Sequence, residues 1–137
     1  MKTFAKYIFT ASLFFILFSS CKKESPVIAQ SSDTAQSLVI GKPVKIGNLE
    51  IAQNDFPYKL DWATAVKSCA DLGLGWRLPS SSEFKIISDN VSNIPGIKLN
   101  QGGYWLNQES RAYEPSNKYV GAENKLSALY VRAVRSF

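Results

Sequence analysis

The chain has 137 residues, with 16 Lys or Arg, 11 Asp or Glu, two cysteines and no histidine. Without histidine it lacks the commonest metal ligand and the commonest general base, so the sequence predicts neither a histidine-based metal centre nor a Ser-His or Cys-His catalytic pair. The basic residues are scattered and form no stripe, which argues against nucleic acid as a partner.

The first 20 residues have the pattern of a secretory signal peptide. Two lysines precede an apolar run over residues 8–18, which is shorter than the roughly 20 residues of a membrane-spanning helix. Two serines then lead directly to Cys21. This order resembles a bacterial lipoprotein signal, which implies cleavage before Cys21 and lipidation of that residue with acyl chains such as palmitate. An ordinary signal peptide with an incidental cysteine is the alternative.

Residues 21–37 are predicted to form the lipidated cysteine and a flexible tether, because they are polar or small and show no helical or strand period. The start Cys-Lys-Lys-Glu resembles Bacteroidota-type lipoproteins. No aspartate follows the cysteine directly, so the usual signal for retention in the inner membrane is missing. The resemblance implies a cell-envelope protein held in the outer membrane by its lipid anchor. It does not decide between the two leaflets, so exposure at the cell surface is one of the alternatives.

Residues 38–137 are enough for one domain with one core. Short strands are predicted at 44–46 and 48–53. A helix follows, because Asp61 is a good N-cap, apolar residues recur at helical spacing, and Gly73 ends the pattern. Cys69 lies on the apolar face of this helix. With Cys21 assigned to the lipid, Cys69 has no disulfide partner and is predicted to be a small buried side chain rather than a nucleophile.

The next stretch predicts an extended segment that turns into a second helix. Trp76 and Leu78 lie two residues apart, so they share one face of an extended segment and Arg77 points the other way. Ser80 and Glu83 have the spacing of a capping box, in which each residue satisfies the other's backbone N–H. The second helix is therefore predicted from Ser80 to about residue 91.

The C-terminal part contains loops and strands. Residues 93–103 are rich in Asn, Gly and Pro and are predicted to be loop, with a strand at 104–106. Residues 107–117 are polar and irregular, and a strand is expected at 118–120. The last strand, 126–137, carries apolar residues on both faces and is predicted to be central. The order of strands, two helices and further strands predicts an α+β fold.

Five motifs carry a resemblance to a known family. In chain order they are Ile46-Gly47-Asn48-Leu49-Glu50-Ile51-Ala52, Trp62-Ala63-Thr64-Ala65 with Cys69, Gly75-Trp76-Arg77-Leu78-Pro79-Ser80 with Glu83, Tyr104-Trp105, and Val131-Arg132-Ala133-Val134-Arg135. Residues 44–137 thus resemble the bacterial Trp-Arg-Leu-Pro-Thr family of major paralogous domains, related to the C-terminal domain of Lcl collagen-like adhesins. That family resembles C-type lectins and, more distantly, the formylglycine-generating enzyme. The resemblance implies a C-type-lectin-like fold, with two helices flanking a small mixed or antiparallel sheet and the two ends of the domain paired as strands.

Three departures limit what the resemblance implies. Many relatives have a cysteine bonded to the helix cysteine at the position of Ala133. Residues 114–117, Glu-Pro-Ser-Asn, match the calcium motif of animal lectins only in part, and no Trp-Asn-Asp follows. The active-site cysteine pair of the formylglycine-generating enzymes is missing. No metal and no other cofactor is therefore expected.

The resemblance places a ligand on the irregular segment 93–120. The first functional hypothesis is a membrane-anchored, non-catalytic binding module for a glycan or a protein. Its candidate ligand contacts are Asn107, Gln108, Glu109, Arg111, Tyr113, Glu114 and Asn117. The alternative is a structural subunit of an envelope, fimbrial or adhesin assembly. An enzyme built on carboxylates such as Asp55, Glu109 and Glu114 is not favoured, because nothing in the sequence fixes a pair in space.

Overall fold

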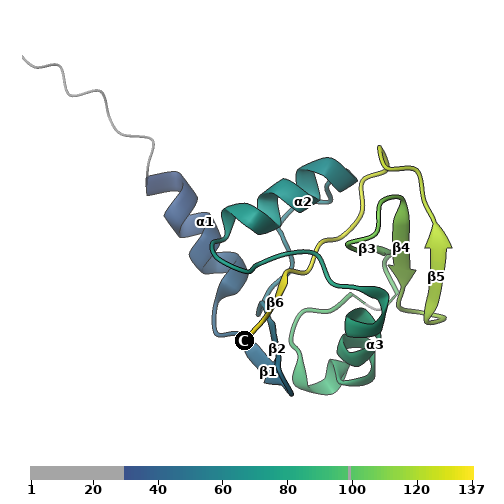
Figure 1. Cartoon of the computed structure of the whole chain (residues 1–137), viewed down its shortest axis with the longest axis horizontal. Coiled ribbons are helices and arrows are strands. Elements are labelled where there is room, and N and C mark those ends of the chain that lie inside the picture. The colour runs from purple at the N-terminus through teal and green to yellow at the C-terminus, as the bar shows by residue number, and fades with distance from the viewer. Residues whose placement is uncertain (1–29, 99) are drawn as a thin grey trace, which may run out of the picture.

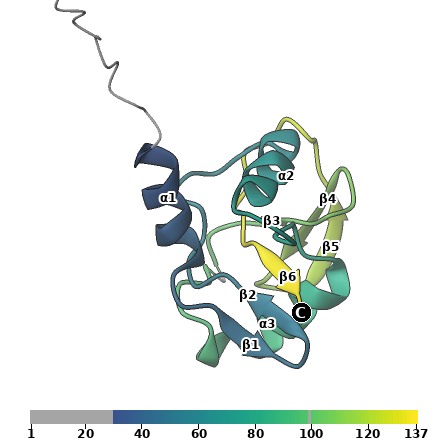
Figure 2. The same cartoon turned by 60° about the vertical axis from the view of Figure 1, so that its left-hand side comes forward.

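The computed structural model describes residues 30–98 and 100–137. The predicted signal peptide, Cys21 and the first part of the predicted tether lie outside the described residues. Within those residues, helix α1 (Gln30–Ile40) leads into a domain that contains two three-stranded sheets (Figure 1, Figure 2). The sheets lie toward opposite ends of the domain in Figure 1, with α1 on the side away from β5.

Helix α1 differs from the expected tether, which was predicted to continue to residue 37. Its last turn is held to the domain, because Val39 is buried and the Asn54 side chain donates to the Leu38 carbonyl at 2.8 Å. The Gln36 side chain also donates to the Asp71 carbonyl. Apolar residues occur together only at the C-terminal end of this helix, so the sequence showed no helical period that could have predicted it.

The first sheet joins the two ends of the domain. Strands β1 (Val44–Ile46), β2 (Leu49–Ile51) and β6 (Val134–Ser136) are antiparallel in the order β1-β2-β6. The turn between β1 and β2 contains Gly47 at φ +60°, a left-handed conformation that glycine adopts without strain. The pairing of β2 with β6 confirms the expectation that the beginning and the end of the domain lie side by side.

The two predicted helices of the domain are present. Helix α2 (Trp62–Asp71) begins after Asp61, whose side chain accepts from the Thr64 N–H at 3.1 Å. Helix α3 (Ser81–Asp89) begins after the Ser80 capping box and is followed by a short 3-10 turn, η1 (Val91–Asn93). Cys69 is fully buried on α2, and burial raises the pKa of its thiol to about 12, as expected for a packing residue rather than a nucleophile.

The second sheet contains a strand that the sequence did not predict. Strands β3 (Tyr104–Trp105), β4 (Arg111–Glu114) and β5 (Tyr119–Ala122) are antiparallel in the order β3-β4-β5. Strand β4 lies inside the segment 107–117 that was expected to be irregular. Conversely, the long last strand predicted over residues 126–137 is reduced to β6, with isolated bridges at Leu129 and Tyr130.

The core forms two clusters, and the alternation of side chains in β3 divides its residues between them. Trp105 lies in the cluster that includes Cys69 of α2 and Trp76, whereas Tyr104 lies in the cluster that includes Phe84 of α3. The Phe84 ring centroid is 4.8 Å from those of both Tyr104 and Tyr113. Helix α3 is therefore packed against the second sheet by aromatic rings.

Arg132 forms a buried polar network just before β6. Its side chain is completely buried and donates to Asp55 Oδ1 at 2.6 Å and to the carbonyls of Ala52, Gln53 and Pro95. Tyr104 donates to the other Asp55 oxygen at 2.8 Å. The guanidinium thus ties the loops after β2 and around Pro95 to the C-terminal segment. The sequence pattern placed Arg132 on one face of a strand but did not predict its burial or its pairing with Asp55.

Candidate functional site

Residues 107–117, the part of the segment 93–120 that carries the candidate contacts, form the turn before β4, strand β4 and most of the turn between β4 and β5. The turn before β4 is closed by a hydrogen bond from the Leu106 N–H to the Arg111 carbonyl at 3.1 Å. The turn between β4 and β5 is closed in part by the Asn117 side chain, which accepts from the Tyr119 N–H at 3.0 Å. Each turn holds one non-glycine residue at positive φ, Ser110 at 58° and Lys118 at 55°.

The predicted contact residues lie at two separate places. Asn107, Gln108 and Glu109 are exposed in the turn before β4, and Asn117 is exposed in the turn after it. Four residues of strand separate these turns, which corresponds to roughly 13 Å. Glu109 is paired with Lys125 at 3.1 Å on the solvent side. Therefore the structure does not bring these residues together around one ligand-sized space.

The three predicted contacts on β4 face different surroundings. Arg111 is exposed at the start of the strand, and Glu114 is partly exposed at its end. Glu114 accepts from the Ser116 hydroxyl at 3.0 Å, so it is engaged within its own turn. Tyr113 is only 2% exposed, because its ring packs against Phe84 of α3. Its hydroxyl oxygen has no hydrogen-bond partner among the described residues.

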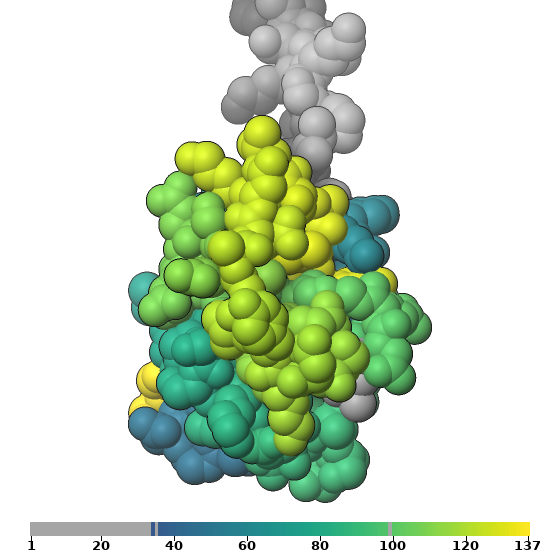
Figure 3. Space-filling model, turned by 90° about the vertical axis from the view of Figure 1, so that its right-hand side faces the viewer, coloured from purple at the N-terminus to yellow at the C-terminus, as the bar shows by residue number. Residues whose placement is uncertain are grey.

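Two hollows border the hairpin, one on each of its faces. The helix-side hollow lies between the hairpin and α3, has a volume of about 270 Å³, and is lined by Ser81, Ser82, Lys85, Tyr113, Lys118 and Val120. The far-side hollow has a volume of about 200 Å³, and its polar lining comes from Glu114, Tyr119 and Glu123. Figure 3 shows the face on which the hairpin lies, with yellow-green atoms of the chain around β5 across its centre.

The helix-side hollow carries positive charge. Lys85 and Lys118 each donate to one oxygen of Asp89 at 2.7 Å, from α3 and from the β4–β5 turn respectively. Lys118, and then Lys85, hold the pKa of Asp89 down to about 2, and Asp89 raises the pKa of Lys118. Two ammonium charges and one carboxylate charge leave a net of +1 beside the hollow.

The start of α3, which forms one wall of this hollow, is fixed by a larger network than the predicted capping box. Ser80 and Glu83 satisfy each other's backbone N–H groups, which confirms the capping box. Arg77 was expected to point away from the face shared by Trp76 and Leu78, and its side chain is 40% exposed while theirs are buried. From there its guanidinium makes a two-bond pair with Glu83, at 2.8 Å for each bond, and the pKa of Glu83 falls to about 2 mainly for that reason.

Apart from Tyr113, the residues around the helix-side hollow were not singled out from the sequence. Ser81, Ser82 and Lys85 lie within the first turns of α3, and Ser81 and Lys85, four residues apart, are neighbours on the helix surface. A polar helix face alone is usually a solvated one. What makes this face a candidate site is Lys118. It is 29 residues from Asp89 in the sequence, and only the fold brings it next to this face of α3.

Comparisons with known proteins bear on the fold. No protein-family model matches the chain, and no curated protein matches it. Among solved structures, the crystal structure of botrocetin, a snake C-type lectin-like protein, matches with a TM-score of 0.57 and 12% identity, covering 71% of this chain and 98% of botrocetin. The fold is C-type-lectin-like. At this identity the similarity concerns the fold alone, and it agrees with the predicted fold class.

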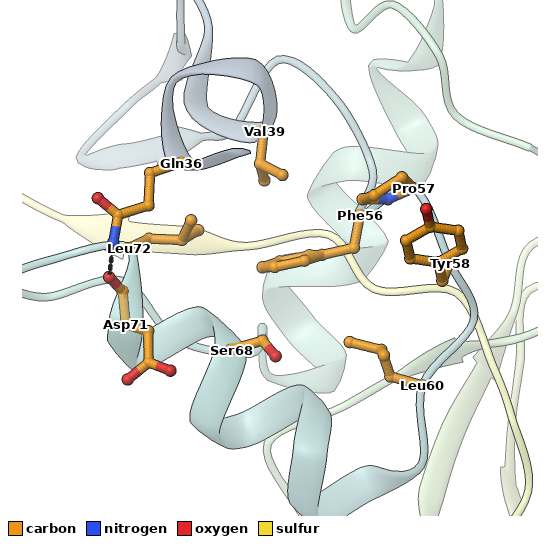
Figure 4. Close-up of a pocket in the computed structure, with 9 residues that line it drawn as sticks. All are labelled: Gln36, Val39, Phe56, Pro57, Tyr58, Leu60, Ser68, Asp71 and Leu72. Atoms are coloured by element: carbon orange, nitrogen blue, oxygen red, sulfur yellow. Dashed lines mark hydrogen bonds between the residues drawn. The ribbon is translucent and has the colours of Figure 1, made fainter. Parts of the chain in front are cut away.

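A third concave surface of this C-type-lectin-like domain lies far from the hairpin. The α1–α2 groove, with a volume of about 280 Å³, is bordered by α1, α2 and the loop between β2 and α2 (Figure 4). Its lining is mainly apolar, with Val39, Phe56, Tyr58, Leu60 and Leu72. Tyr58 is 75% exposed at its rim. This groove was not anticipated, because α1 itself was not predicted.

The described residues also bear on metal binding and on membrane spanning. Within residues 30–98 and 100–137, no three acidic, cysteine or histidine side chains are grouped closely enough to hold a metal ion. The described helices include none that is long and apolar enough to cross a membrane. Asp55, considered above among carboxylates for catalysis, is the buried partner of Arg132.

Proposed function

We propose that this protein is a non-catalytic binding module for a glycan or a protein, and that its ligand binds at the β4–β5 hairpin. The observation that carries the proposal is that this hairpin is bordered on both faces by hollows whose linings include polar side chains. Ligand sites are concave and place a few polar groups around a limited space. The fold alone would not decide this, because one fold hosts many functions.

The same proposal includes the cell context inferred from the sequence. The module is carried by lipid on Cys21 in the cell envelope, at the outer membrane, and it belongs with the Trp-Arg-Leu-Pro-Thr and Lcl-type domains that its motifs resemble. The C-type-lectin-like fold is compatible with that family. Mass determination of the mature N-terminal peptide tests the anchor directly, since an acylated Cys21 adds the mass of its fatty acids.

A second candidate function is a structural subunit of an envelope or adhesin assembly, and the α1–α2 groove favours it. Its apolar lining and the exposed ring of Tyr58 are the kind of surface that protein interfaces use. Figure 4 shows the Phe56, Tyr58 and Leu60 side chains from the loop between β2 and α2 gathered on one side of this groove. In this reading the hairpin would be a solvated edge and the groove would carry the contact.

Two exposed tyrosines separate these candidates. Tyr119 is 63% exposed on β5, and Tyr58 is 75% exposed at the α1–α2 groove. We would immobilise the full chain, expose it to envelope extract and to purified cell-surface polysaccharides, and identify what is retained. A binding module at the hairpin loses retention in Tyr119→Ala when the ligand lies in the far-side hollow, or in Lys118→Gln when it lies in the helix-side hollow, and keeps it in Tyr58→Ala. The reverse pattern, with retained protein only, supports the assembly role and contradicts the hairpin site.

A further inference from the structure

The hydroxyl of Tyr113 is the starting observation. Its side chain is 2% exposed and lines the helix-side hollow, and its oxygen has no hydrogen-bond partner among the described residues. A buried hydroxyl without a partner destabilises the folded protein, because it has lost its hydrogen bonds to water. Phenylalanine would fill the same space without this cost. The hydroxyl can therefore form a hydrogen bond with a group that occupies the hollow when a ligand is bound.

The lysines of the hollow show what kind of group fits. Lys85 donates to Asp89 Oδ2 and Lys118 donates to Asp89 Oδ1, so the two ammonium groups are already spaced to hold the two oxygens of one carboxylate. Each ammonium has three N–H donors, and the bond to Asp89 uses one of them. Donors therefore remain for a second carboxylate, and the net charge of +1 beside the hollow favours a single negative charge.

The helix contributes further polar groups. The first turn of α3 supplies the hydroxyls of Ser81 and Ser82, and Ser82 already shares a hydrogen bond with Ser80 at 3.0 Å. Backbone N–H groups in the first turn of a helix lack partners within the helix and favour negative charge. Glu83 lies at the same helix end, but its negative charge is paired with the Arg77 guanidinium. The positive end of α3 is therefore not cancelled by an unpaired acid.

The size and lining of the hollow favour a sugar over a peptide. About 270 Å³ lies at the lower edge of ligand-sized pockets, enough for one small ring with its carboxylate. Its lining offers hydroxyls, which can both donate and accept as sugar hydroxyls require, together with the carbon chains of two lysines and Val120. It holds no deep apolar space for the side chains of a peptide.

From these observations we infer that the helix-side hollow binds the carboxylate of an acidic sugar unit, with Lys85 and Lys118 at the carboxylate and the Tyr113 hydroxyl at the same unit. This inference rests on the proposed binding function and specifies its ligand class and site. The first turn of α3 closes the hollow on the side opposite the hairpin.

The test measures binding of the full chain to a galacturonic acid trisaccharide by calorimetry at low salt, with a neutral glucose trisaccharide, a sulfated disaccharide and a hexaglutamate peptide as references. We expect saturable binding of the uronic trisaccharide and none of the neutral one. Tyr113→Phe should weaken binding about tenfold, as for the loss of one hydrogen bond to a polar ligand group, while its melting temperature stays the same or rises. Lys118→Gln should weaken it at least as much.

Lys125→Gln is the matched control, because Lys125 also pairs with a carboxylate, Glu109, near the other end of the hairpin but outside the hollow. Its affinity should equal that of the wild type. Unchanged binding in both Tyr113→Phe and Lys118→Gln would overturn the site. Binding of the sulfated sugar or the peptide alone would overturn the ligand class. If the immobilised chain retains neutral glycan or protein but no uronic sugar, this inference fails while the proposed function stands.

Discussion

Asp55 and Asp89 make the same kind of bond in opposite surroundings. Asp55 meets Arg132 where the arginine side chain is fully buried and the aspartate side chain is 6% exposed. Asp89 meets Lys85 and Lys118 at the surface, where all three side chains are between 38% and 65% exposed. Burial raises the pKa of Asp55 although Arg132 opposes the effect, whereas the two lysines lower the pKa of Asp89.

This difference in burial decides which of these groups are available to a ligand. Around Arg132 the donors are taken up by Asp55 and by three backbone carbonyls, so the network ties loops together and offers nothing to solvent. Around Asp89 the lysines keep free donors and line a hollow. The Arg77–Glu83 pair lies between these extremes, with side chains 40% and 19% exposed. Burial should therefore rank the three groups by their effect on folding.

The largest effect is expected for Arg132→Met. The substitution leaves Asp55 buried without its counter-charge and leaves the carbonyls of Ala52, Gln53 and Pro95 without their donor. Breaking a buried pair in this way costs about 3–5 kcal/mol, which urea denaturation would measure. Adding Asp55→Asn to the same chain should recover part of the loss, because it removes the stranded charge. A loss below about 1 kcal/mol in Arg132→Met would contradict the structural role of this pair.

An intermediate effect is expected at the start of α3, and it depends on pH. The pKa of Glu83 is lowered from 4.5 to about 2, chiefly by Arg77. The stability from this pair is therefore fully present above pH 4.5 and is lost as pH falls from 4.5 toward 2. Allowing for solvent screening, Glu83→Gln should cost about 1–2 kcal/mol at neutral pH.

Arg77→Met gives the control for that pH dependence. Without the guanidinium, the pKa of Glu83 should rise toward its ordinary value, so the loss of stability between pH 4.5 and pH 2 should shrink. Denaturation midpoints of wild type and variant, measured across this range, would show two curves that converge at low pH. Parallel curves would mean that other carboxylates dominate acid unfolding.

Sequence distance explains which of these features could be predicted. The capping box was visible because Ser80 and Glu83 are three residues apart and their residue types are specific to helix starts. The Arg132 pair joins residues 77 positions apart, and an arginine among alternating apolar residues resembles an exposed strand position. Cys69 was placed correctly on the buried face of α2, because the helical period extends over the whole helix.

The candidate site was predictable only as a region. Polar residues from Asn107 to Asn117 marked the chain segment, but its four-residue strand β4 is too short to give a clear alternation, so Tyr113 was treated like its exposed neighbours. The helix-side hollow needs Lys85 and Lys118 on the same carboxylate, a contact between α3 and a turn far along the chain. No local pattern encodes that contact.

The smallest effect on folding is expected for Asp89→Asn, in contrast to the large effect expected when the buried pair of Asp55 is broken. Because Asp89 is exposed and screened by water, the urea midpoint should stay within the scatter of repeated measurements. Binding should change in the other direction: removing the carboxylate raises the net charge beside the hollow and frees one donor on each lysine. We expect the uronic trisaccharide to bind about threefold more tightly at low salt, with the gain disappearing at high salt. Weaker binding at an unchanged midpoint would mean instead that Asp89 holds the two lysines in position, and the surface pair would then serve the site through geometry rather than through charge.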